Sequence, residues 1–405
     1  MKQRVVITGV GAISGLGTDA QTMWDKLCRG RSAIQPLGEL GAGTRISVGA
    51  RVPDYDPEEH FSSNDMPLLD RFSQFAIIAT RDALQNAGLA PGTPAVNAAA
   101  AIIGTGCGGK QTDEETYAGL YRDKRPRAHP LTIPKGMPSA AASQVSQHLG
   151  IKGPVFSVAS ACASAAHAIL QGKLLIQAGL VDIAIVGGSD APFTFGLMKA
   201  WEALRVVSSD TCRPFSNDRS GMVLGEGAGM LVLESEQHAC ERNGKIYAEL
   251  VGCGLSSNAG HITRPDIAGI SSAIASALDD AGMKPEEIGY INAHGTATAT
   301  NDPAETAAIH KVFGSHANRL AVSSNKSMLG HTLGAASALE LIATVLAVYH
   351  GVLPPTVNFT EAGEGCDLDY VPNIARKQTV NAALSNAFAF GGLNAVLAVS
   401  RWTHH

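Results

Sequence analysis

The sequence lacks a surplus of positive charge, and this bears on the class of partner. Its 405 residues hold 31 Lys and Arg against 36 Asp and Glu, a formal net charge of −5. Nucleic-acid binding normally depends on a basic field over one face of a protein. We therefore expect no nucleic-acid partner.

Paired cysteines and long apolar runs are also lacking. The seven cysteines form no CxxC pair and leave one over in any pairing scheme, which favours free thiols in a reducing compartment and offers no metal site. We find no run of 18 apolar residues and expect no membrane span. Thr8 and Gly9 interrupt the apolar start, so it predicts a first strand rather than a signal peptide, and the expected location is the cytoplasm.

Short apolar runs alternate with helical patterns along the chain, which predicts an α/β fold with strands buried on both faces. Two runs open alike, VVITGVGAIS at residues 5–14 and AELVGCGLSS at residues 248–257, and each precedes a helix ending in Ala-Gly. This likeness suggests a duplicated α/β unit. The polar segment 112–134 is the longest candidate loop or excursion.

Two glycine-rich stretches imitate nucleotide-binding motifs. GTGCGGKQ, residues 104–111, comes close to a phosphate-binding loop, but Gln111 stands where a magnesium-binding Ser or Thr is needed. GVGAISG, residues 9–15, has its third glycine one place too late for a dinucleotide fingerprint. We interpret the first stretch as a loop whose glycines allow its backbone to approach another group closely. The second is interpreted as a tight turn after the first strand.

A lone cysteine, Cys162, lies in the small-residue run SVASACASAAHAI at residues 157–169. The residues after it predict a helix over 163–179, so the thiol stands at a helix N-terminus, where the dipole favours a thiolate. His167 is the nearest imidazole in sequence. Five helical residues turn the direction by about 140°, so His167 does not share a face with Cys162 and is expected to be a packed helix residue.

Two further stretches supply imidazoles at the ends of predicted strands. INAHGTATATNDPAE holds His294, and SSNKSMLGHTLGAA holds Lys326 and His331. Polar residues at such strand ends line sites in α/β folds. A thiol and two imidazoles suit acyl transfer, with the thiol as nucleophile.

Four ordered motifs carry a resemblance that spans the chain: SACASAAHA, NAHGTATATND, NKSMLGHTLGAAS and SNAFAFGGLNA. The chain resembles the β-ketoacyl-acyl carrier protein synthases, and PKGMPSAAA and GGSDAP look most like the nodulation-type and aryl-polyene-type branch. The resemblance implies a thiolase-like fold, with duplicated α/β halves in five αβαβα layers. We expect the halves at residues 1–250, with the nucleophilic Cys162, and 251–405, with both histidines and a Phe/Gly gating loop. A dimer is expected.

The resemblance also implies roles for individual residues. Cys162 would accept the acyl group, and its backbone N–H and that of Phe390 would form an oxyanion hole. His294 and His331 would hold the thioester carbonyl of the malonyl substrate during decarboxylation. The remaining implied roles are pantetheine binding at Thr296 and Thr298, and gating of the acyl pocket at Phe388 and Phe390. No cofactor is implied beyond the phosphopantetheine of the carrier protein.

Lys326 and Glu305 match a paired lysine and glutamate of the family. A buried ion pair that organises the site is as good an interpretation as direct catalysis. Asp302, in the same stretch as Glu305, is expected to be structural.

The sequence departs from the family at its surface and in its pocket. Residues 61–72 lack the expected basic side chains, so carrier docking is expected at Arg205 and, in the run 121–130, at Arg125 and Arg127; a solvated loop is the alternative for that run. The pocket is expected to be reshaped by three substitutions, at Trp201, Cys107 and Thr132, the last near a position filled by the partner subunit in the family.

These observations predict an elongating 3-oxoacyl-acyl carrier protein synthase that adds two carbons from malonyl carrier to a fatty acyl, polyene or polyketide chain. Its partners would be the acyl carrier protein and a second copy or a chain-length subunit. The alternatives are a chain-length subunit itself, disfavoured by Cys162, a degradative thiolase, and a phosphate-loop NTPase. Cys366 does not stand in a thiolase-like context.

Overall fold

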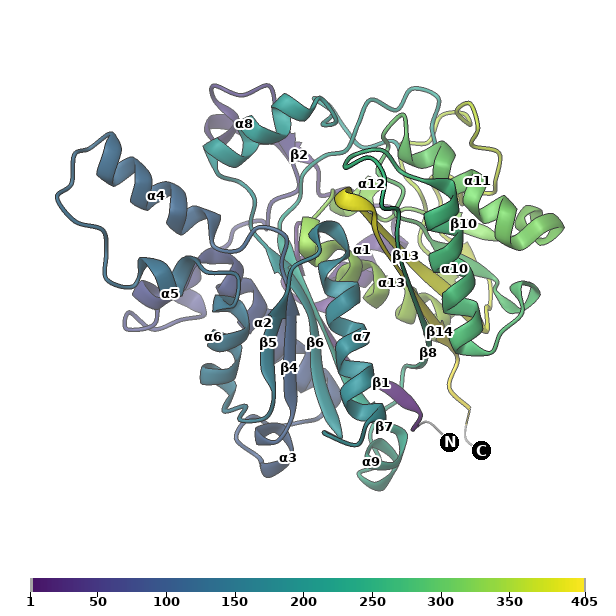
Figure 1. Cartoon of the computed structure of the whole chain (residues 1–405), viewed down its shortest axis with the longest axis horizontal. Coiled ribbons are helices and arrows are strands. Elements are labelled where there is room, and N and C mark those ends of the chain that lie inside the picture. Colours follow the sequence, from purple (N-terminus) through teal and green to yellow (C-terminus); the bar gives the residue numbers. More distant parts are fainter. Residues whose placement is uncertain (1–2, 404–405) are drawn as a thin grey trace.

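The computed structural model describes residues 3–403, which form a mixed α/β structure (Figure 1). Five strands of the large sheet come from the first part of the chain: β1 (Val5–Ser14), β4 (Ala100–Gly104), β5 (Val155–Val158), β6 (Ile183–Asp190) and β7 (Gly227–Ser235). Five more come from the second part: β8 (Ala248–Ser257), β9 (Tyr290–Asn292), β10 (Ala321–Ser323), β13 (Ala382–Ala389) and β14 (Leu393–Ser400).

The strand order shows that the two parts repeat one topology. The sheet runs β10-β9-β13-β14-β8-β1-β7-β6-β4-β5. Counted within each part, both sets read third, second, fourth, fifth, first from the outer edge to the centre. The parts meet where β1 and β8 pair antiparallel through Val6 with Glu249 and Ile7 with Ala248. The predicted duplication is confirmed, and its second unit begins at Ala248, three residues before the division predicted at 250/251.

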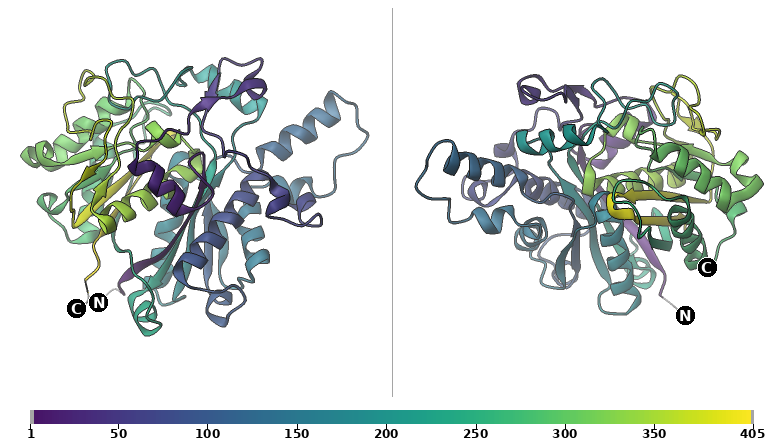
Figure 2. Two further views of the ribbon diagram at one scale, coloured as in Figure 1. Left: turned by 180° about the vertical axis from the view of Figure 1, so that it is seen from behind. Right: turned by 45° about the horizontal axis from the view of Figure 1, so that its top comes forward.

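Helices complete a five-layer arrangement around the two strand sets (Figures 1 and 2). The outer layer of the first half contains α2 (Arg71–Ala87) and α6 (Ala140–Leu149). The central layer contains α7 (Ser164–Gln177) and α13 (Ala336–His350), and the outer layer of the second half contains α10 (Ile267–Ala281) and α11 (Asn301–Phe313). Separate clusters of buried apolar side chains fill the spaces between these layers.

Glycines inside β1 and β8 let an outer helix pack directly against each strand. A Cβ atom on Gly11 would lie 2.1 Å from the carbonyl oxygen of Ala79 in α2. In the second half, a Cβ atom on Gly254 would lie 2.0 Å from the carbonyl oxygen of Ala273 in α10. The prediction of a tight turn at residues 9–15 is therefore wrong for Gly9 and Gly11, because the strand runs through them to Ser14.

The polar segment 112–134 lies on an arm that projects from the body (Figures 1 and 2). The arm is formed by α4 (Lys110–Tyr121), the exposed loop 122–131 and α5 (Thr132–Gly136). The prediction of an excursion is confirmed, although two helices account for about half of it.

The remaining helices and strands are short: α1 (Ala20–Cys28), α3 (Pro94–Asn97), α8 (Phe195–Leu204), α9 (Glu236–Glu241), α12 (Lys326–Leu329), β2 (Gln35–Pro36), β3 (Val48–Gly49), β11 (Val352–Leu353) and β12 (Arg376–Lys377).

The segment Leu333–His350 is long and apolar enough, by length and composition alone, to cross a membrane, with a mean hydropathy of 1.5 over its 18 residues. No such stretch was expected from the sequence, because Glu340 interrupts the apolar run. In the structure 89% of the segment is buried inside the protein. Its helix, α13, is the central core helix between the two halves.

Candidate active site

Cys162 lies in a single 3-10 turn, Ala161–Ala163, which leads directly into α7. The predicted position at a helix N-terminus is confirmed. Ala161 adopts a left-handed φ of +50°, and Cys162 is 7% exposed. The end of β4 packs closely behind this turn, since a Cβ atom on Gly104 would lie 2.4 Å from the backbone of Ser164.

The partner of the thiol comes from the second half. The Nε2 atom of His331 lies 3.0 Å from Cys162 Sγ, across 169 residues of sequence. His167 instead places its Nδ1 atom 2.9 Å from both the Ala163 carbonyl oxygen and Ser160 Oγ. The nearest histidine in sequence is thus held by its own helix.

His294 follows β9 and lies against His331, with ring centroids 5.6 Å apart at an interplanar angle of 85°. Lys326 Nζ lies 3.4 Å from His294 Nδ1, and the backbone N–H of Leu333 donates to His331 Nδ1 at 3.2 Å. An ammonium group and a backbone amide can only donate, so both Nδ1 atoms accept. The proton of each neutral ring is therefore on Nε2.

The predicted pairing of Lys326 with Glu305 is wrong. Lys326 Nζ pairs with the carboxylate of Glu340 on α13, and both side chains are buried. Glu305, on α11, lies below the His294 loop and accepts the backbone N–H groups of His294 and Gly295, each at 2.9 Å. Glu340 therefore compensates the charge of Lys326, and Glu305 holds the backbone of His294.

Asp302 lies beside Glu305 on α11 and is fully buried. It accepts the backbone N–H of Phe215 at 2.8 Å and the side-chain amide of Asn301 at 3.2 Å. The bond from Phe215 fastens a loop of the first half to α11.

The electrostatics of the site keep both imidazoles uncharged. Burial and the Lys326 ammonium lower the pKa of His294 and of His331 well below 6.5. Burial raises the pKa of the Cys162 thiol to about 12, opposed by Lys326, and raises the pKa of Glu340 to about 7. The histidines are therefore neutral hydrogen-bond donors at physiological pH.

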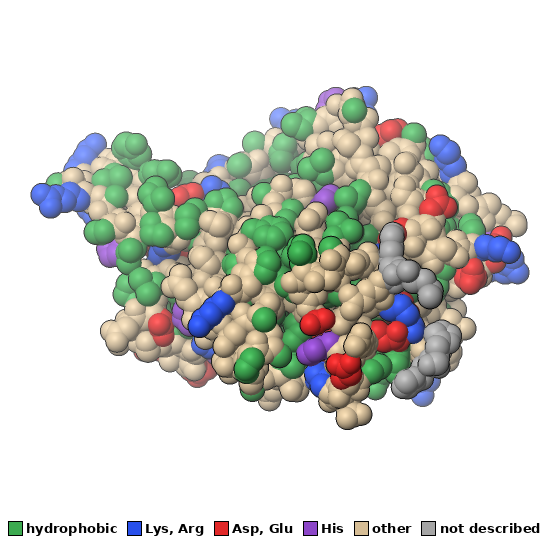
Figure 3. Space-filling model, turned by 60° about the horizontal axis from the view of Figure 1, so that its bottom comes forward, with side chains coloured by type: hydrophobic (Ala, Val, Ile, Leu, Met, Phe, Trp, Pro, Cys, Tyr) green, Lys and Arg blue, Asp and Glu red, His purple; other side chains and the backbone are tan. Residues whose placement is uncertain are grey.

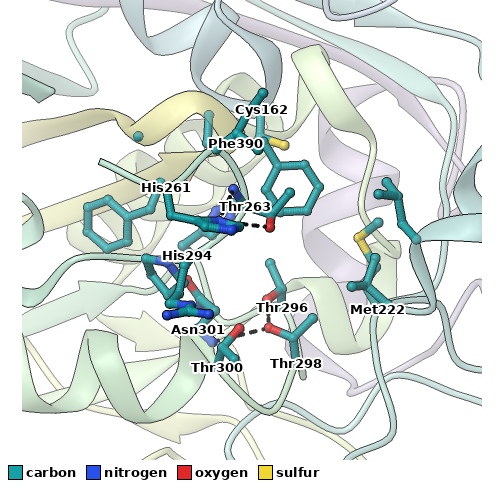
Figure 4. A pocket seen from close by; sticks show the side chains of 18 of the residues that line it. Cys162, Met222, His261, Thr263, His294, Thr296, Thr298, Thr300, Asn301 and Phe390 are labelled. Atoms are coloured by element: carbon teal, nitrogen blue, oxygen red, sulfur yellow. Dashed lines mark hydrogen bonds between the residues drawn. The ribbon is translucent and has the colours of Figure 1, made fainter. Parts of the chain in front are cut away.

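The Cys162 thiol and the two imidazoles face one cavity of about 290 Å³ (Figure 4). Figure 4 shows Cys162 and Phe390 at one end and the hydroxyls of Thr296, Thr298 and Thr300 at the other. The predicted site residues that line it are Cys162, Trp201, His294, Thr296, Thr298, His331, Phe388 and Phe390. Thr296 and Thr298 bond through their hydroxyls at 3.0 Å, and the rings of Trp201 and Phe390 stack with centroids 6.1 Å apart.

The loop 258–265, between β8 and α10, lines the same cavity and was missed in the sequence. Its backbone is bonded to the turn after Phe390, with Gly391 donating to the Ile262 carbonyl at 2.7 Å and Asn258 donating to that of Gly392 at 3.0 Å. The polar run SSNAGHITRPD, between a strand and a helix, was the available signal.

The other predicted residues lie away from the cavity surface. Cys107 packs in an apolar cluster that includes Trp201, and Arg205 is exposed beside two residues that line the cavity. Thr132, Arg125 and Arg127 line a second cavity, of about 240 Å³, on the arm. Within one chain, the arm does not bring these three residues to Cys162.

The glycine loop 104–111 already has an acceptor from the protein itself. Gly106 and Cys107 donate their backbone N–H groups to Asp190 at 2.8 and 3.0 Å, and Gly108 donates to Thr105 Oγ1 at 2.9 Å. The donors that a bound phosphate would require are thus used by a buried carboxylate and a hydroxyl. Within residues 3–403, no three His, Cys, Asp or Glu side chains are placed to hold a metal ion.

Comparison with known proteins identifies the family. Residues 2–239 match the model of the β-ketoacyl synthase N-terminal domain, and residues 247–360 match that of the C-terminal domain. Nodulation protein E of Rhizobium sp. (strain N33) is 50% identical over 98% of this chain and 99% of its own, and 3-oxoacyl-[acyl-carrier-protein] synthase 2 of Coxiella burnetii is 40% identical over 99% of both.

Two solved structures share the fold over almost the whole chain. The ishigamide ketosynthase/chain length factor superposes with a TM-score of 0.94 at 36% identity, covering 100% of both chains. A type II polyketide acyl carrier protein in complex with its ketosynthase, bound to the hexaketide, gives 0.90 at 30%, covering 99% of this chain and 100% of that one. The chain belongs to the β-ketoacyl synthase family of condensing acyltransferases, with a thiolase-like fold.

Proposed function

We propose that the protein extends acyl chains on an acyl carrier protein by decarboxylative condensation with malonyl carrier, with Cys162, His294 and His331 as its catalytic residues. One observation carries this proposal. A buried thiol lies 3.0 Å from a neutral imidazole, and a second neutral imidazole faces the same cavity. A nucleophile beside two uncharged donors is what acyl transfer followed by enolate formation requires.

The first step loads the acyl chain. Cys162 Sγ bonds to the thioester carbon, the carbon–sulfur bond to pantetheine breaks, and the thiol proton ends on the released pantetheine sulfur. The N-terminus of α7 favours negative charge at Cys162, and the Nε2–H of His331 can donate to the sulfur as its charge develops. The backbone N–H groups of Cys162 and Phe390 are proposed to receive the oxyanion.

The second step forms the carbon–carbon bond. The bond from malonyl to its carboxylate breaks, carbon dioxide leaves, and the electron pair moves to the thioester oxygen, which the Nε2–H groups of His294 and His331 stabilise. The enolate carbon then attacks the acyl carbon on Cys162, and the thiolate leaves. The product is a 3-oxoacyl chain two carbons longer. Neutral imidazoles suit this step, because it needs donors and no strong base.

Lys326 and the carboxylates position these donors. Lys326 keeps the proton of His294 on Nε2 and lowers the pKa of both rings, while Glu340 compensates its charge. Glu305 holds the backbone of His294. Lys326 therefore acts through the histidines, and Glu305 and Glu340 are positioning residues.

The remaining cavity residues are proposed to bind substrate. The hydroxyls of Thr296 and Thr298 would hold the pantetheine arm, and Phe388 with Phe390 would gate the acyl pocket, which Trp201 narrows. No cofactor is proposed apart from the phosphopantetheine that the carrier brings. Arg205 at the cavity edge is proposed as a docking contact for the acidic carrier, with Arg125 and Arg127 of the arm as further contacts.

The protein is proposed to act as a dimer in the cytoplasm. β5 is an outer edge of the large sheet, and its Phe156 is 37% exposed. The partner would be a second copy or a ketosynthase-like chain-length subunit, since one similar structure is named a ketosynthase/chain length factor.

Specialised polyene or lipid-signal synthesis is proposed over housekeeping fatty acid synthesis, because Nodulation protein E is more similar to this chain than the synthase 2 relative is.

Incubation with acyl-carrier protein followed by intact mass measurement tests the proposal. We expect one acyl mass on the wild type and on the control variant Cys240→Ala, and none on Cys162→Ala. We expect His294→Ala to accept the acyl group yet lose condensation with malonyl carrier by about 100-fold or more, the size of loss on removing an oxyanion donor. An acyl group on Cys107, or normal product from His294→Ala, would contradict the mechanism.

A further inference from the structure

Asp190, the last residue of β6, is a buried carboxylate that accepts four hydrogen bonds. The donors are Thr105 Oγ1 at 2.7 Å and the backbone N–H groups of Gly106, Cys107 and Gly334 at 2.8, 3.0 and 2.6 Å. Asp190 is 0% exposed. A carboxylate has only acceptors and can satisfy all four donors, whereas an amide would turn its own N–H groups toward some of them.

Asp190 and three of its donors belong to the first half, and the fourth bond joins the two halves of the fold. Thr105, Gly106 and Cys107 follow β4 in the first half, and Gly334 belongs to the 3-10 turn Leu333–Ala335 of the second half. The two backbones touch here, since a Cβ atom on Gly334 would lie 2.3 Å from the Gly106 nitrogen. Asp190 therefore fastens the second half's turn to the first half's glycine loop.

The turn that Asp190 holds also sets the proton of His331. Leu333, the residue before Gly334, has a left-handed φ of +51° and donates its N–H to His331 Nδ1 at 3.2 Å. That bond leaves the proton of the neutral ring on Nε2, which faces Cys162 Sγ at 3.0 Å. Asp190 is the side chain that holds the Gly334 N–H, directly after the strained Leu333 amide that is aimed at Nδ1, so its loss would loosen that amide.

We propose that Asp190 is a positioning residue for His331: by accepting Gly334 N–H it fixes the Leu333 turn and so keeps the Nε2–H tautomer aimed at Cys162. The inference deepens the proposed function, on which it rests, by adding a residue that acts on a catalytic group without touching it. The half that carries the thiol thereby orients the imidazole of the other half.

The charge of Asp190 fits this role. Burial raises its pKa to about 6, although all four hydrogen bonds oppose the rise. The carboxylate is therefore ionised at pH 7.5 and holds its donors with charge-assisted bonds.

The tautomer of His331 can be read directly by long-range ¹H–¹⁵N correlation spectra of the ¹⁵N-histidine-labelled protein, with His331 assigned by its loss in His331→Gln. We expect the Nε2–H pattern in the wild type and a partial or complete change in Asp190→Asn. The matched control is Asp82→Asn. Asp82, on α2, is a partly buried carboxylate, and it accepts the backbone N–H groups of Ala12 and Ala20. Its His331 signals should match the wild type.

A second variant covers the case in which Asp190→Asn does not fold. Thr105→Val removes one hydroxyl donor and should move the His331 signals in the same direction by a smaller amount. In activity, Asp190→Asn should lower condensation by about 10- to 100-fold, as when the partner of an oriented histidine is lost. The KM for malonyl carrier should change by less than about threefold, and Cys162 should still accept the acyl group.

The inference is overturned if folded Asp190→Asn, or Thr105→Val in its place, keeps the wild-type His331 signals, or if Asp82→Asn alters them equally. Failure of the proposed function looks different. In that case the wild type itself would form no acyl adduct or no 3-oxoacyl product, while the tautomer measurement, which needs no substrate, would still decide the role of Asp190.

Discussion

The two histidines of the cavity are neutral because of what surrounds each ring. Each ring is buried, and the ammonium of Lys326 lowers the pKa of both, so protonation would place a second positive charge in a buried site. The ammonium group of Lys326 is itself buried, and the buried carboxylate of Glu340 compensates its charge. A buried pair of this kind is costly to break by removing one partner.

The lowered pKa of His331 predicts a pH-dependent contribution to stability. In the unfolded chain a histidine takes up a proton near pH 6.5, whereas the buried ring does not, so the unfolded state binds more protons as the pH falls. The contribution is complete above pH 6.5 and is lost on acidification. Between pH 7.5 and 5.5 the free energy of unfolding of the wild type should fall by about 1.4 kcal/mol more than that of His331→Gln.

Urea unfolding at the two pH values measures this difference directly. Replacing His167, which is half-buried and hydrogen-bonded to its own helix, with Gln provides the comparison. Its pH dependence, measured in parallel, gives the effect of removing a histidine that does not face the cavity. Equal slopes for the wild type and His331→Gln would show that the ring is charged in the folded protein, and would contradict the role of neutral donor.

At the scale of elements, the same strand and helix contact occurs once in each half. Gly9 and Gly11 of β1 face α2, and Gly252 and Gly254 of β8 face α10, in each case at a main-chain oxygen less than 2.5 Å from the place of a Cβ atom. The sequence likeness of GVG to GCG therefore reflects a helix packed directly on a strand. Each helix also ends in a left-handed glycine, Gly88 or Gly282.

This contact predicts matched losses of stability in the two halves. Gly11→Ala and Gly254→Ala should each force the outer helix away from its strand and lower the free energy of unfolding by about 1–3 kcal/mol, as overpacking does in well-packed cores. Gly260→Ala is the control, because its Cβ atom would meet nothing nearer than 3.6 Å and the backbone there needs no left-handed φ.

Denaturant titration of the three variants gives the comparison. The control should remain within about 0.5 kcal/mol of the wild type. If Gly11→Ala and Gly254→Ala matched the control, the close packing of α2 and α10 would not be a feature of the folded protein in solution.

The sequence predicted these elements unevenly, and the reason is the range of the interactions. Local patterns placed Cys162 at a helix N-terminus and the histidines after strands, because strand ends and helix starts are set by nearby residues. The partner of Lys326 could not be predicted, since Glu340 lies on a helix that meets it only in the folded core. The glycines of β1 were misread for the same reason, because α2 is distant in sequence.

At the scale of the molecule, the duplicated topology determines where the site lies. Both halves place their centre strands, β1 and β8, side by side in one sheet, so α7 and α13 are enclosed between two equivalent sets of strands. Cys162 lies in the 3-10 turn that leads into α7, and His331 lies two residues before the 3-10 turn that leads into α13. A site shared between the halves follows from this arrangement, and neither half holds the thiol together with its imidazoles.

The outer edge of the first half has features that predict association. β5 ends the sheet, and the arm, with the Met137 that follows it, carries exposed apolar side chains: Tyr117, Tyr121, Ile133 and Met137 are between 37% and 76% exposed. Figure 3 shows hydrophobic side chains together with Lys and Arg on this arm at the left of the view. Unpaired strand edges and contiguous apolar patches are features of interfaces between chains.

Phe156 in the middle of β5 therefore offers a test of the dimer. The purified wild type should have twice the mass of the chain, 41.9 kDa, in light scattering after gel filtration. Phe156→Asp should raise the dissociation constant by about 100-fold or more, because it puts a charge in place of a central aromatic side chain. Ile374→Asp is the matched control, since Ile374 is 80% exposed and lies outside both β5 and the arm. A wild type that remains a monomer would exclude the homodimer and favour a different ketosynthase-like subunit as partner.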